Sequence, residues 1–131
     1  MSKYLQFDDI VFKDRRLLLA ALEDVGYREV EEGQALPLYG YHGDKRLEIA
    51  ELVVRRKHVG SLSNDIGFTR TPSGYVPILS EYDQRTLHDG RFLAKLRTAY
   101  SERVVEEMKR RLHGTAHRQV EGSVIKIRMR F

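Results

Sequence analysis

Three carboxylates in this sequence, Asp65, Glu81 and Asp83, are candidates for acid–base chemistry. They flank stretches rich in β-forming residues, so the hairpins of a sheet could gather them at one end. Paired carboxylates do acid–base work when they are buried together, and Tyr41 would add a phenol to such a site. Acids at strand ends more often cap turns, and we favour that structural role. A small enzyme with a carboxylate and tyrosine site is kept as an alternative.

The histidines and glycine-rich stretches do not form a recognisable cofactor site. Cys is absent, which excludes disulfides, thiolate ligands and Cys nucleophiles. His113 and His117 have the spacing of two ligands on one helix face, but Gly114 is expected to end the helix between them. The other histidines fall in expected turns without a motif: His42, His58 and His88. Phosphate loops, dinucleotide fingerprints and nucleophile elbows are missing. The sequence therefore predicts no catalytic residue, no metal site and no cofactor.

Basic residues are concentrated towards the C-terminus. Residues 1–83 carry 11 Lys+Arg and 14 Asp+Glu, a net charge of −3, whereas residues 84–131 carry 12 and 5, a net charge of +7. On an extended tail, Lys126, Arg128 and Arg130 would share one face about 6.6–6.8 Å apart, near the phosphate repeat of an extended single strand. Tyrosines that could stack on bases are Tyr4, Tyr39, Tyr41 and Tyr75. Solubilising charge is the plainer explanation, so a nucleic-acid-binding module using this basic strand and the preceding helix is a second alternative.

Two helices and several strands must position these residues. Apolar spacing predicts a helix over residues 14–25, with Asp14 as its N-cap and Gly26 just past its end. A second apolar stripe predicts a helix over residues 89–113, ended by Gly114. Proline at the second position and glycine at the fourth favour a type I turn and a hairpin at residues 71–74. The expected strands are 4–12, 27–31, 47–56, 63–70, 74–80 and 117–131.

This element order predicts a single α+β domain over residues 1–131. An antiparallel sheet of about five to seven strands would carry two helices on one face, in a distantly ferredoxin-like architecture whose strand order is left open. Gly67, between Ile66 and Phe68, would leave a gap on the opposite face where a neighbouring backbone or a partner could approach closely. The N-terminal sequence lacks the apolar core of a secretory signal, and apolar runs are too short to span a membrane. We therefore expect a cytoplasmic protein.

Several segments together resemble a known family, the hypothetical chloroplast reading frame thirty-five family of cyanobacteria, algal plastids and other bacteria. The similar segments are Leu22-Glu23-Asp24-Val25-Gly26-Tyr27, Gly40-Tyr41-His42-Gly43, Ala50-Glu51-Leu52-Val53-Val54, Asp65-Ile66-Gly67-Phe68, Gly74-Tyr75, Phe92-Leu93, Ala99-Tyr100-Ser101-Glu102-Arg103-Val104-Val105 and Glu121-Gly122-Ser123-Val124-Ile125-Lys126-Ile127-Arg128. The chain departs from the plastid type in lacking Trp, with Phe131 at its end, and in its basic Arg55-Arg56-Lys57 run.

The resemblance implies a domain of unknown function with no catalytic residue to carry over. It also implies a protein partner, with a AAA ATPase or a ferredoxin-like protein as candidates. From the residues and the resemblance together we expect a non-catalytic binding or accessory module. Its candidate binding surface comprises Tyr41, Asp65, Gly67, Lys126, Arg128 and Arg130.

Overall fold

The computed structural model describes residues 2–118 of the 131-residue chain and confirms the α+β class. In chain order the elements are β1 (Tyr4–Gln6), α1 (Arg15–Asp24), β2 (Glu31–Tyr39), β3 (Lys45–Val54), α2 (Arg56–Val59), β4 (Ile66–Thr71), β5 (Gly74–Ser80), α3 (Glu81–Thr86), the 3₁₀ helix η1 (Leu87–Gly90) and α4 (Phe92–Arg118). The strands form one antiparallel sheet in the order β1-β5-β4-β3-β2. Strands β2 to β5 thus form a meander, which differs from the split βαβ order of ferredoxin-like proteins.

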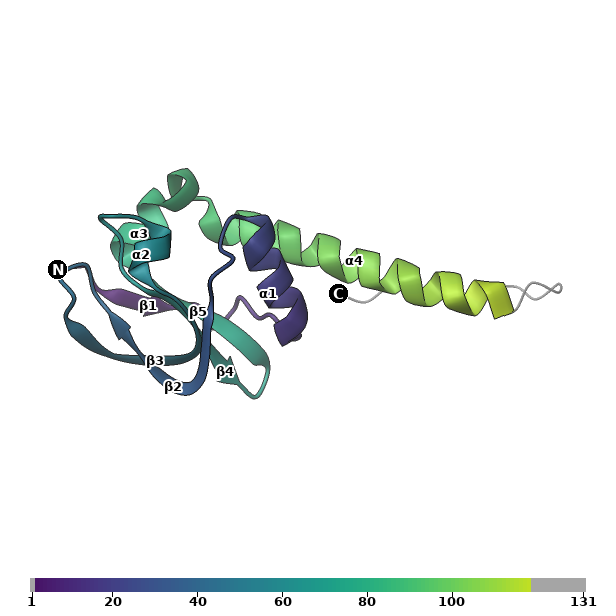
Figure 1. Cartoon of the computed structure of the whole chain (residues 1–131), viewed down its shortest axis with the longest axis horizontal. Helices are drawn as coiled ribbons and strands as arrows, with labels where there is room; N and C mark the ends of the chain where they lie inside the picture. The colour runs from purple at the N-terminus through teal and green to yellow at the C-terminus, as the bar shows by residue number, and fades with distance from the viewer. Residues whose placement is uncertain (1, 119–131) are drawn as a thin grey trace.

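Helices α1 and α4 cover one face of the sheet, as the sequence predicts (Figure 1). Leu18 and Leu22 of α1 and Leu96 of α4 are fully buried in one hydrophobic cluster with Phe68 of β4. Burial of this apolar surface is the main stabilising term of the domain. Helices α2 and α3 lie apart from this layer, at the end of the sheet nearest the N-terminus (Figure 1).

The ends of α1 follow the predicted chemistry closely. Asp14 Oδ1 accepts a hydrogen bond from the Leu17 amide at 3.1 Å. Gly26 has φ +108° and closes the C-terminus in the left-handed region. The predicted strand at residues 27–31 is wrong, because the Tyr27 amide donates to Leu22 O at 2.8 Å and stays tied to the helix end. Strand β2 begins only at Glu31.

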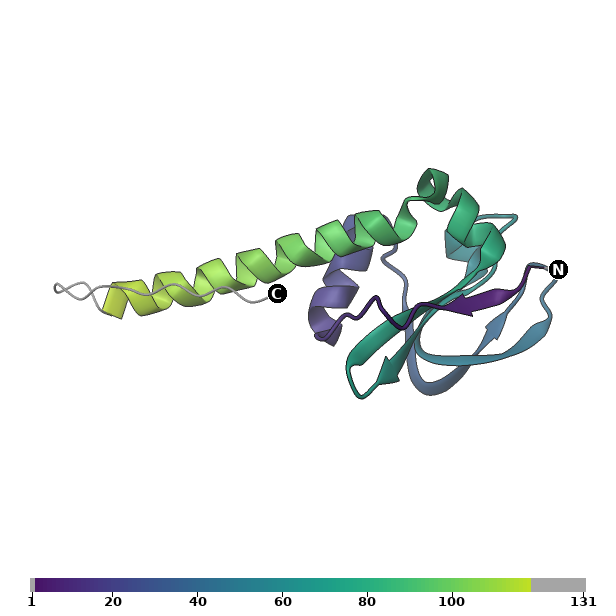
Figure 2. The same ribbon diagram turned by 180° about the vertical axis from the view of Figure 1, so that it is seen from behind.

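Helix α4 differs from its predicted bounds at both ends. It starts at Phe92, because His88 and Asp89, inside η1, have positive φ values of 50° and 57° and interrupt the helical path before α4. It continues through Gly114 to Arg118, and it reaches well beyond the sheet (Figure 2). An interior glycine costs a helix only about 1 kcal/mol relative to alanine. The rest of the predicted tail strand, residues 119–131, lies outside the described residues.

A second, smaller core occupies the opposite face of the sheet. Its buried members are Tyr4, Leu38, Ala50, Val53 and Ile78, which come from β1, β2, β3 and β5. The β2–β3 hairpin bends so that the end of β2 meets the residue before β4, and the Asp65 amide donates to Tyr39 O at 3.0 Å. The predicted β4–β5 hairpin is confirmed, with Thr71 paired to Gly74.

Candidate functional site

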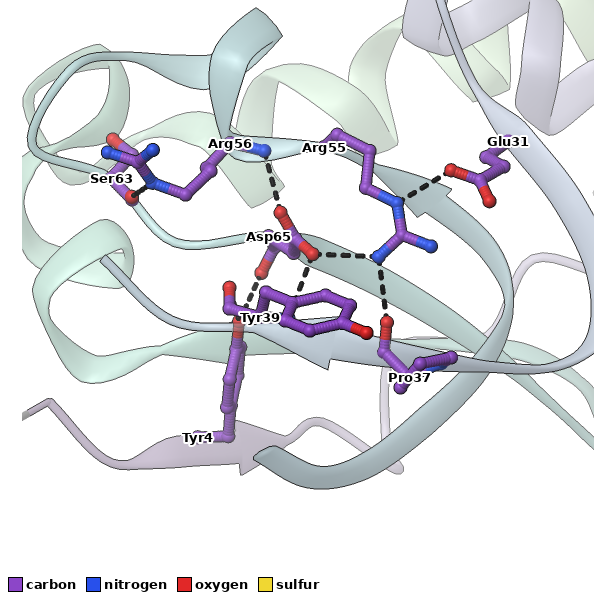
Figure 3. Close-up of polar contacts among 8 residues, drawn as sticks. All are labelled: Tyr4, Glu31, Pro37, Tyr39, Arg55, Arg56, Ser63 and Asp65. Carbon is purple, nitrogen blue, oxygen red and sulfur yellow. Dashed lines mark hydrogen bonds and ion pairs between the residues drawn. The ribbon is translucent and has the colours of Figure 1, made fainter. Parts of the chain in front are cut away.

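Asp65 lies at the point where β2, β3 and β4 meet, and it is 1% exposed. Its Oδ1 accepts from the Arg56 amide at 2.7 Å, and its Oδ2 accepts from the Tyr39 amide at 2.8 Å (Figure 3). The Arg55 Nη1 group donates to the same Oδ2 at 2.8 Å. Three donors on one carboxylate hold it as a structural acceptor.

Arg55 connects Asp65 to the edge of the sheet. Its Nε donates to Glu31 Oε2 at 2.6 Å, and its Nη1 also donates to Pro37 O at 2.7 Å. The guanidinium lies over the Tyr39 ring, 5.7 Å from the centroid. The hydrogen bond from Arg55 lowers the pKa of Glu31 and raises the pKa of Arg55. Asp65 and Arg55 therefore occupy backbone groups of β2 that an edge strand would otherwise leave open.

Tyr4, on β1 at the other end of the strand order, also contacts Asp65. Its hydroxyl donates to Asp65 O at 2.7 Å and lies 3.3 Å from Tyr39 O (Figure 3). Burial raises the pKa of Tyr4, and the negative charges of Asp65 and Asp83 raise it further. Tyr4 therefore stays protonated at neutral pH and acts as a hydrogen-bond donor.

Asp83 is fully buried at the start of α3. Its Oδ2 accepts from the Ser80 hydroxyl at 2.8 Å and from the Asn64 amide at 3.0 Å, while Ser80 Oγ accepts from the Asp83 amide at 3.0 Å. Within residues 2–118, Asp83 Oδ1 has no hydrogen-bond partner. The spacing Ser80-x-x-Asp83 is that of a helix-capping pair, which is the signal that could have predicted α3. Glu81, the third candidate acid, is exposed on α3.

A pocket of about 240 Å³ lies beside these buried groups. Tyr41, Leu62 and Tyr82 supply its apolar wall, and Asp44 and Arg46 supply its polar wall. We call this hollow the Tyr41–Leu62 pocket. A larger depression of about 710 Å³ is lined, among the described residues, by side chains of α4 alone. The smaller pocket brings together side chains from the β2–β3 turn, the loop before β4 and α3.

The loop that carries Tyr41 is held by backbone and side-chain contacts. The Tyr41 amide donates to Asn64 Oδ1 at 2.8 Å. The Gly40 amide donates to Asp44 O, and the Gly43 amide donates to Gly40 O, each at 2.9 Å. Gly43 has φ +77°, which explains the glycine at this turn. The turn follows directly on Tyr39, the last residue of β2, and leads into β3 at Lys45.

The predicted site residues separate into three groups. Tyr41 lines the pocket, whereas the carboxylates of Asp65 and Asp83 are engaged behind it and do not line it. Gly67 is buried, and a Cβ there would lie 3.0 Å from Ala50 Cβ and 3.1 Å from Leu38 Cδ1. The gap that the sequence predicts beside Gly67 is filled by side chains of this chain. The basic row lies outside the described residues: Lys126, Arg128 and Arg130.

Sequence reasoning missed four further residues of the pocket, because none of them belongs to a motif. They are Asp44, Arg46, Leu62 and Tyr82. Of the histidines, His42 lines the pocket, His88 contacts the Tyr27 hydroxyl at 3.0 Å, and His58 and His113 are exposed. Among the described residues, no group of three His, Asp or Glu side chains is arranged to hold a metal ion. The arrangement suits docking of an apolar side chain better than proton transfer.

Comparison with known families matches residues 21–124 to the family described as protein of unknown function (DUF1257). The chain belongs to the DUF1257 family. The DUF1257 match begins inside α1 and covers β2 to β5, so it includes Asp65 and nearly all of the pocket. No curated protein and no solved structure matches the chain. None of the helices within residues 2–118 combines the length and apolar character needed to cross a bilayer.

Proposed function

We propose that this DUF1257 chain is a non-catalytic binding or accessory module that docks a protein partner at the Tyr41–Leu62 pocket. One observation carries the proposal: two exposed apolar side chains flank a hollow that has a fixed loop as its wall. Tyr41 is 41% exposed and Leu62 is 57% exposed. Interfaces concentrate binding energy in a few anchors that fill such hollows, and aromatic residues are enriched among them.

The fixed conformation of the Tyr41 loop supports the same proposal. The hydrogen bonds from Tyr41 to Asn64 and from Gly40 to Asp44 define the pocket before a partner binds. A preformed surface avoids the entropy cost of ordering a loop during association. The pocket volume of about 240 Å³ is below the roughly 300–1,000 Å³ of sites for whole small molecules. A single side chain of a partner is therefore the better fit.

The buried carboxylates give less support to an enzyme. Asp65 accepts three hydrogen bonds from groups of the fold, and Asp83 Oδ2 accepts from the Asn64 amide and from the hydroxyl of Ser80, the N-cap of α3. A general acid or base must reach a substrate proton, directly or through one water. The two carboxylates lie behind the pocket rather than along its lining, so the carboxylate and tyrosine enzyme remains the weaker alternative.

Site-specific photo-crosslinking tests the proposal. The full-length chain would carry benzoylphenylalanine in place of Leu62 or, as a matched control, in place of Leu47, which is 96% exposed and outside the pocket. In nuclease-treated extract of the source cells, we expect position 62 to label one discrete protein at least about tenfold more strongly than position 47 does. Equal labelling from both positions would contradict docking at the pocket.

The finer sequence-based expectations remain predictions. They are the assignment to the chloroplast reading frame thirty-five family, a AAA ATPase or ferredoxin-like partner, and the cytoplasmic location. Nucleic-acid binding through Lys126, Arg128 and Arg130 remains the second alternative. The crosslinked protein would identify the partner directly.

A further inference from the structure

Two arginine side chains flank the aromatic wall of the Tyr41–Leu62 pocket. Arg46 lines the pocket, donates to Ser2 O at 3.0 Å and lies over the Tyr4 ring, 5.1 Å from the centroid. Arg56 lies over the Tyr41 ring, 5.6 Å from the centroid. A guanidinium held against an aromatic ring keeps its charge and a fixed orientation.

The charges of these two arginines are poorly neutralised. Arg56 donates from its side chain to Ser63 O and Ser61 O, each at 3.1 Å, and both acceptors are uncharged carbonyls. Within residues 2–118 its side chain forms no ion pair. Asp44 is the nearest carboxylate to Arg46, at a loose 3.9 Å from Nε.

The adjoining helix α2 carries further positive charge next to Arg56 in the chain. Helix α2 reads Arg56-Lys57-His58-Val59 and contains no acid, and its Lys57 and His58 are exposed. Arg55 differs from Arg56, because Glu31 and Asp65 both pair with it. The pocket is therefore an apolar hollow bordered by Arg46 and Arg56, with Asp44 as the one carboxylate among the described residues that line it.

From this combination we infer that the occupant is an acidic segment of a partner protein, with one apolar side chain between carboxylates. The apolar side chain fills the hollow beside Leu62, and the carboxylates pair with Arg46 and Arg56. Arginine forms strong, often bidentate hydrogen bonds with carboxylates. This inference rests on the proposed function and adds the chemistry of the partner.

The contacts of Tyr41 favour a peptide over a nucleic acid. Arg56 lies over the Tyr41 ring, and the His42 ring lies 4.7 Å from it at an interplanar angle of 56°. Both contacts compete with a base that would stack on this ring. A phosphate backbone would use the cations but would leave the hollow beside Leu62 unfilled.

Fluorescence anisotropy with a defined probe tests the inference on the full-length protein. The probe is a labelled peptide with one phenylalanine between two runs of three glutamates. Three comparison probes replace phenylalanine by alanine, replace all glutamates by lysine, or use a thymidine oligonucleotide of equal charge. We expect the acidic phenylalanine peptide to bind at least about tenfold more tightly than each comparison probe.

Matched variants assign the binding to the pocket and to the charge. Leu62→Asp should weaken binding of the acidic phenylalanine peptide about tenfold. Leu47→Asp, at an exposed leucine outside the pocket, should leave this binding unchanged. Arg56→Glu should weaken it about tenfold and Arg56→Lys much less. Arg28→Glu is the control, because Arg28 is 80% exposed and outside the pocket lining. Thermal unfolding of each variant checks that the fold is retained.

Each contrary outcome has a definite meaning. If Leu62→Asp weakens peptide binding but the lysine peptide binds as tightly as the glutamate peptide, the inference of an acidic partner is overturned. The proposal of docking at the pocket is then retained. If Leu62→Asp and Leu47→Asp behave alike, both proposals are overturned. Tighter binding of the oligonucleotide, lost in Arg56→Glu, would replace the peptide by a nucleic acid. Failure of the acidic peptide to bind at about 1 mM would also overturn the inference.

Discussion

Asp65 and Arg55 form an ion pair of 2.8 Å that closes the free edge of β2. The carboxylate holds the Tyr39 amide, and the guanidinium holds Pro37 O, so both partners bind the backbone of one edge strand. An unprotected edge offers such groups to another chain. The pair is thus a structural feature of this chain, and it also holds the segments that lead to Tyr41 and Leu62.

Replacing Asp65 by asparagine tests this role. We expect Asp65→Asn to lower the free energy of unfolding by about 2–4 kcal/mol. The side-chain amide has one acceptor oxygen, whereas the donors to Asp65 use both carboxylate oxygens. The variant also leaves Arg55 without its buried counter-charge. Urea denaturation measures the change. The control is Asp24→Asn at the exposed pair with Arg103, 2.6 Å long, which should cost less than about 1 kcal/mol. Equal losses in the two variants would refute the assigned role.

Sequence reasoning succeeded where local chemistry decides the structure. Asp14 caps α1, Gly26 ends it and residues 71–74 form the turn of a hairpin, and each of these features depends on residues within one or two turns. Helix α3 carried a similar local signal in Ser80 and Asp83.

The site was only partly predictable because its contacts join distant segments. Asp65 meets Tyr39 across 26 positions and Tyr4 across 61. The basic run at Arg55 and Arg56 does not reveal which arginine pairs with a carboxylate and which lies over Tyr41. The burial of Gly67 likewise depends on the bend of the β2–β3 hairpin, which no local pattern specifies.

Gly67 allows a direct test of the smaller core. We expect Gly67→Ala to reduce stability by about 1–3 kcal/mol, because the new methyl group would press on Ala50 and Leu38 at 3.0–3.1 Å. The double variant Gly67→Ala with Ala50→Gly should recover part of the loss, since it removes the opposing methyl group. Chemical denaturation of the parent chain, the two single variants and the double variant gives the coupling energy between the two positions. Strictly additive losses would show that the two positions do not press on each other.

The raised pKa of Tyr4 predicts a loss of stability in alkali. The folded state keeps the Tyr4 proton above pH about 10, whereas the unfolded state releases it there. This stabilising contribution is complete below pH 10 and falls by about 1.4 kcal/mol for each further pH unit while the folded tyrosine stays protonated. Tyr27, whose pKa burial also raises, adds to the slope.

Tyr4→Phe should therefore flatten the decline of unfolding free energy between pH 10 and 11 without abolishing it. At neutral pH the same variant should lose about 1 kcal/mol, because Asp65 O loses its donor. Urea titrations at pH 8, 9, 10 and 11 compare the two proteins. Parallel curves above pH 10 would contradict the burial of a protonated Tyr4.

The basic tail provides the remaining test, because it separates the protein-docking proposal from the nucleic-acid alternative. We expect the triple variant with Gln at Lys126, Arg128 and Arg130 to bind single-stranded oligonucleotide as weakly as the parent chain does. If the three residues each contact a phosphate, the triple variant should instead depend less on salt. The magnitude of its negative slope of log affinity against log salt should then be smaller by about 2. Lys109→Gln with Arg110→Gln, on the exposed side of α4, controls for a general loss of positive charge. A lower slope in the triple variant alone would establish the tail as a binding row and move the functional surface away from the Tyr41–Leu62 pocket.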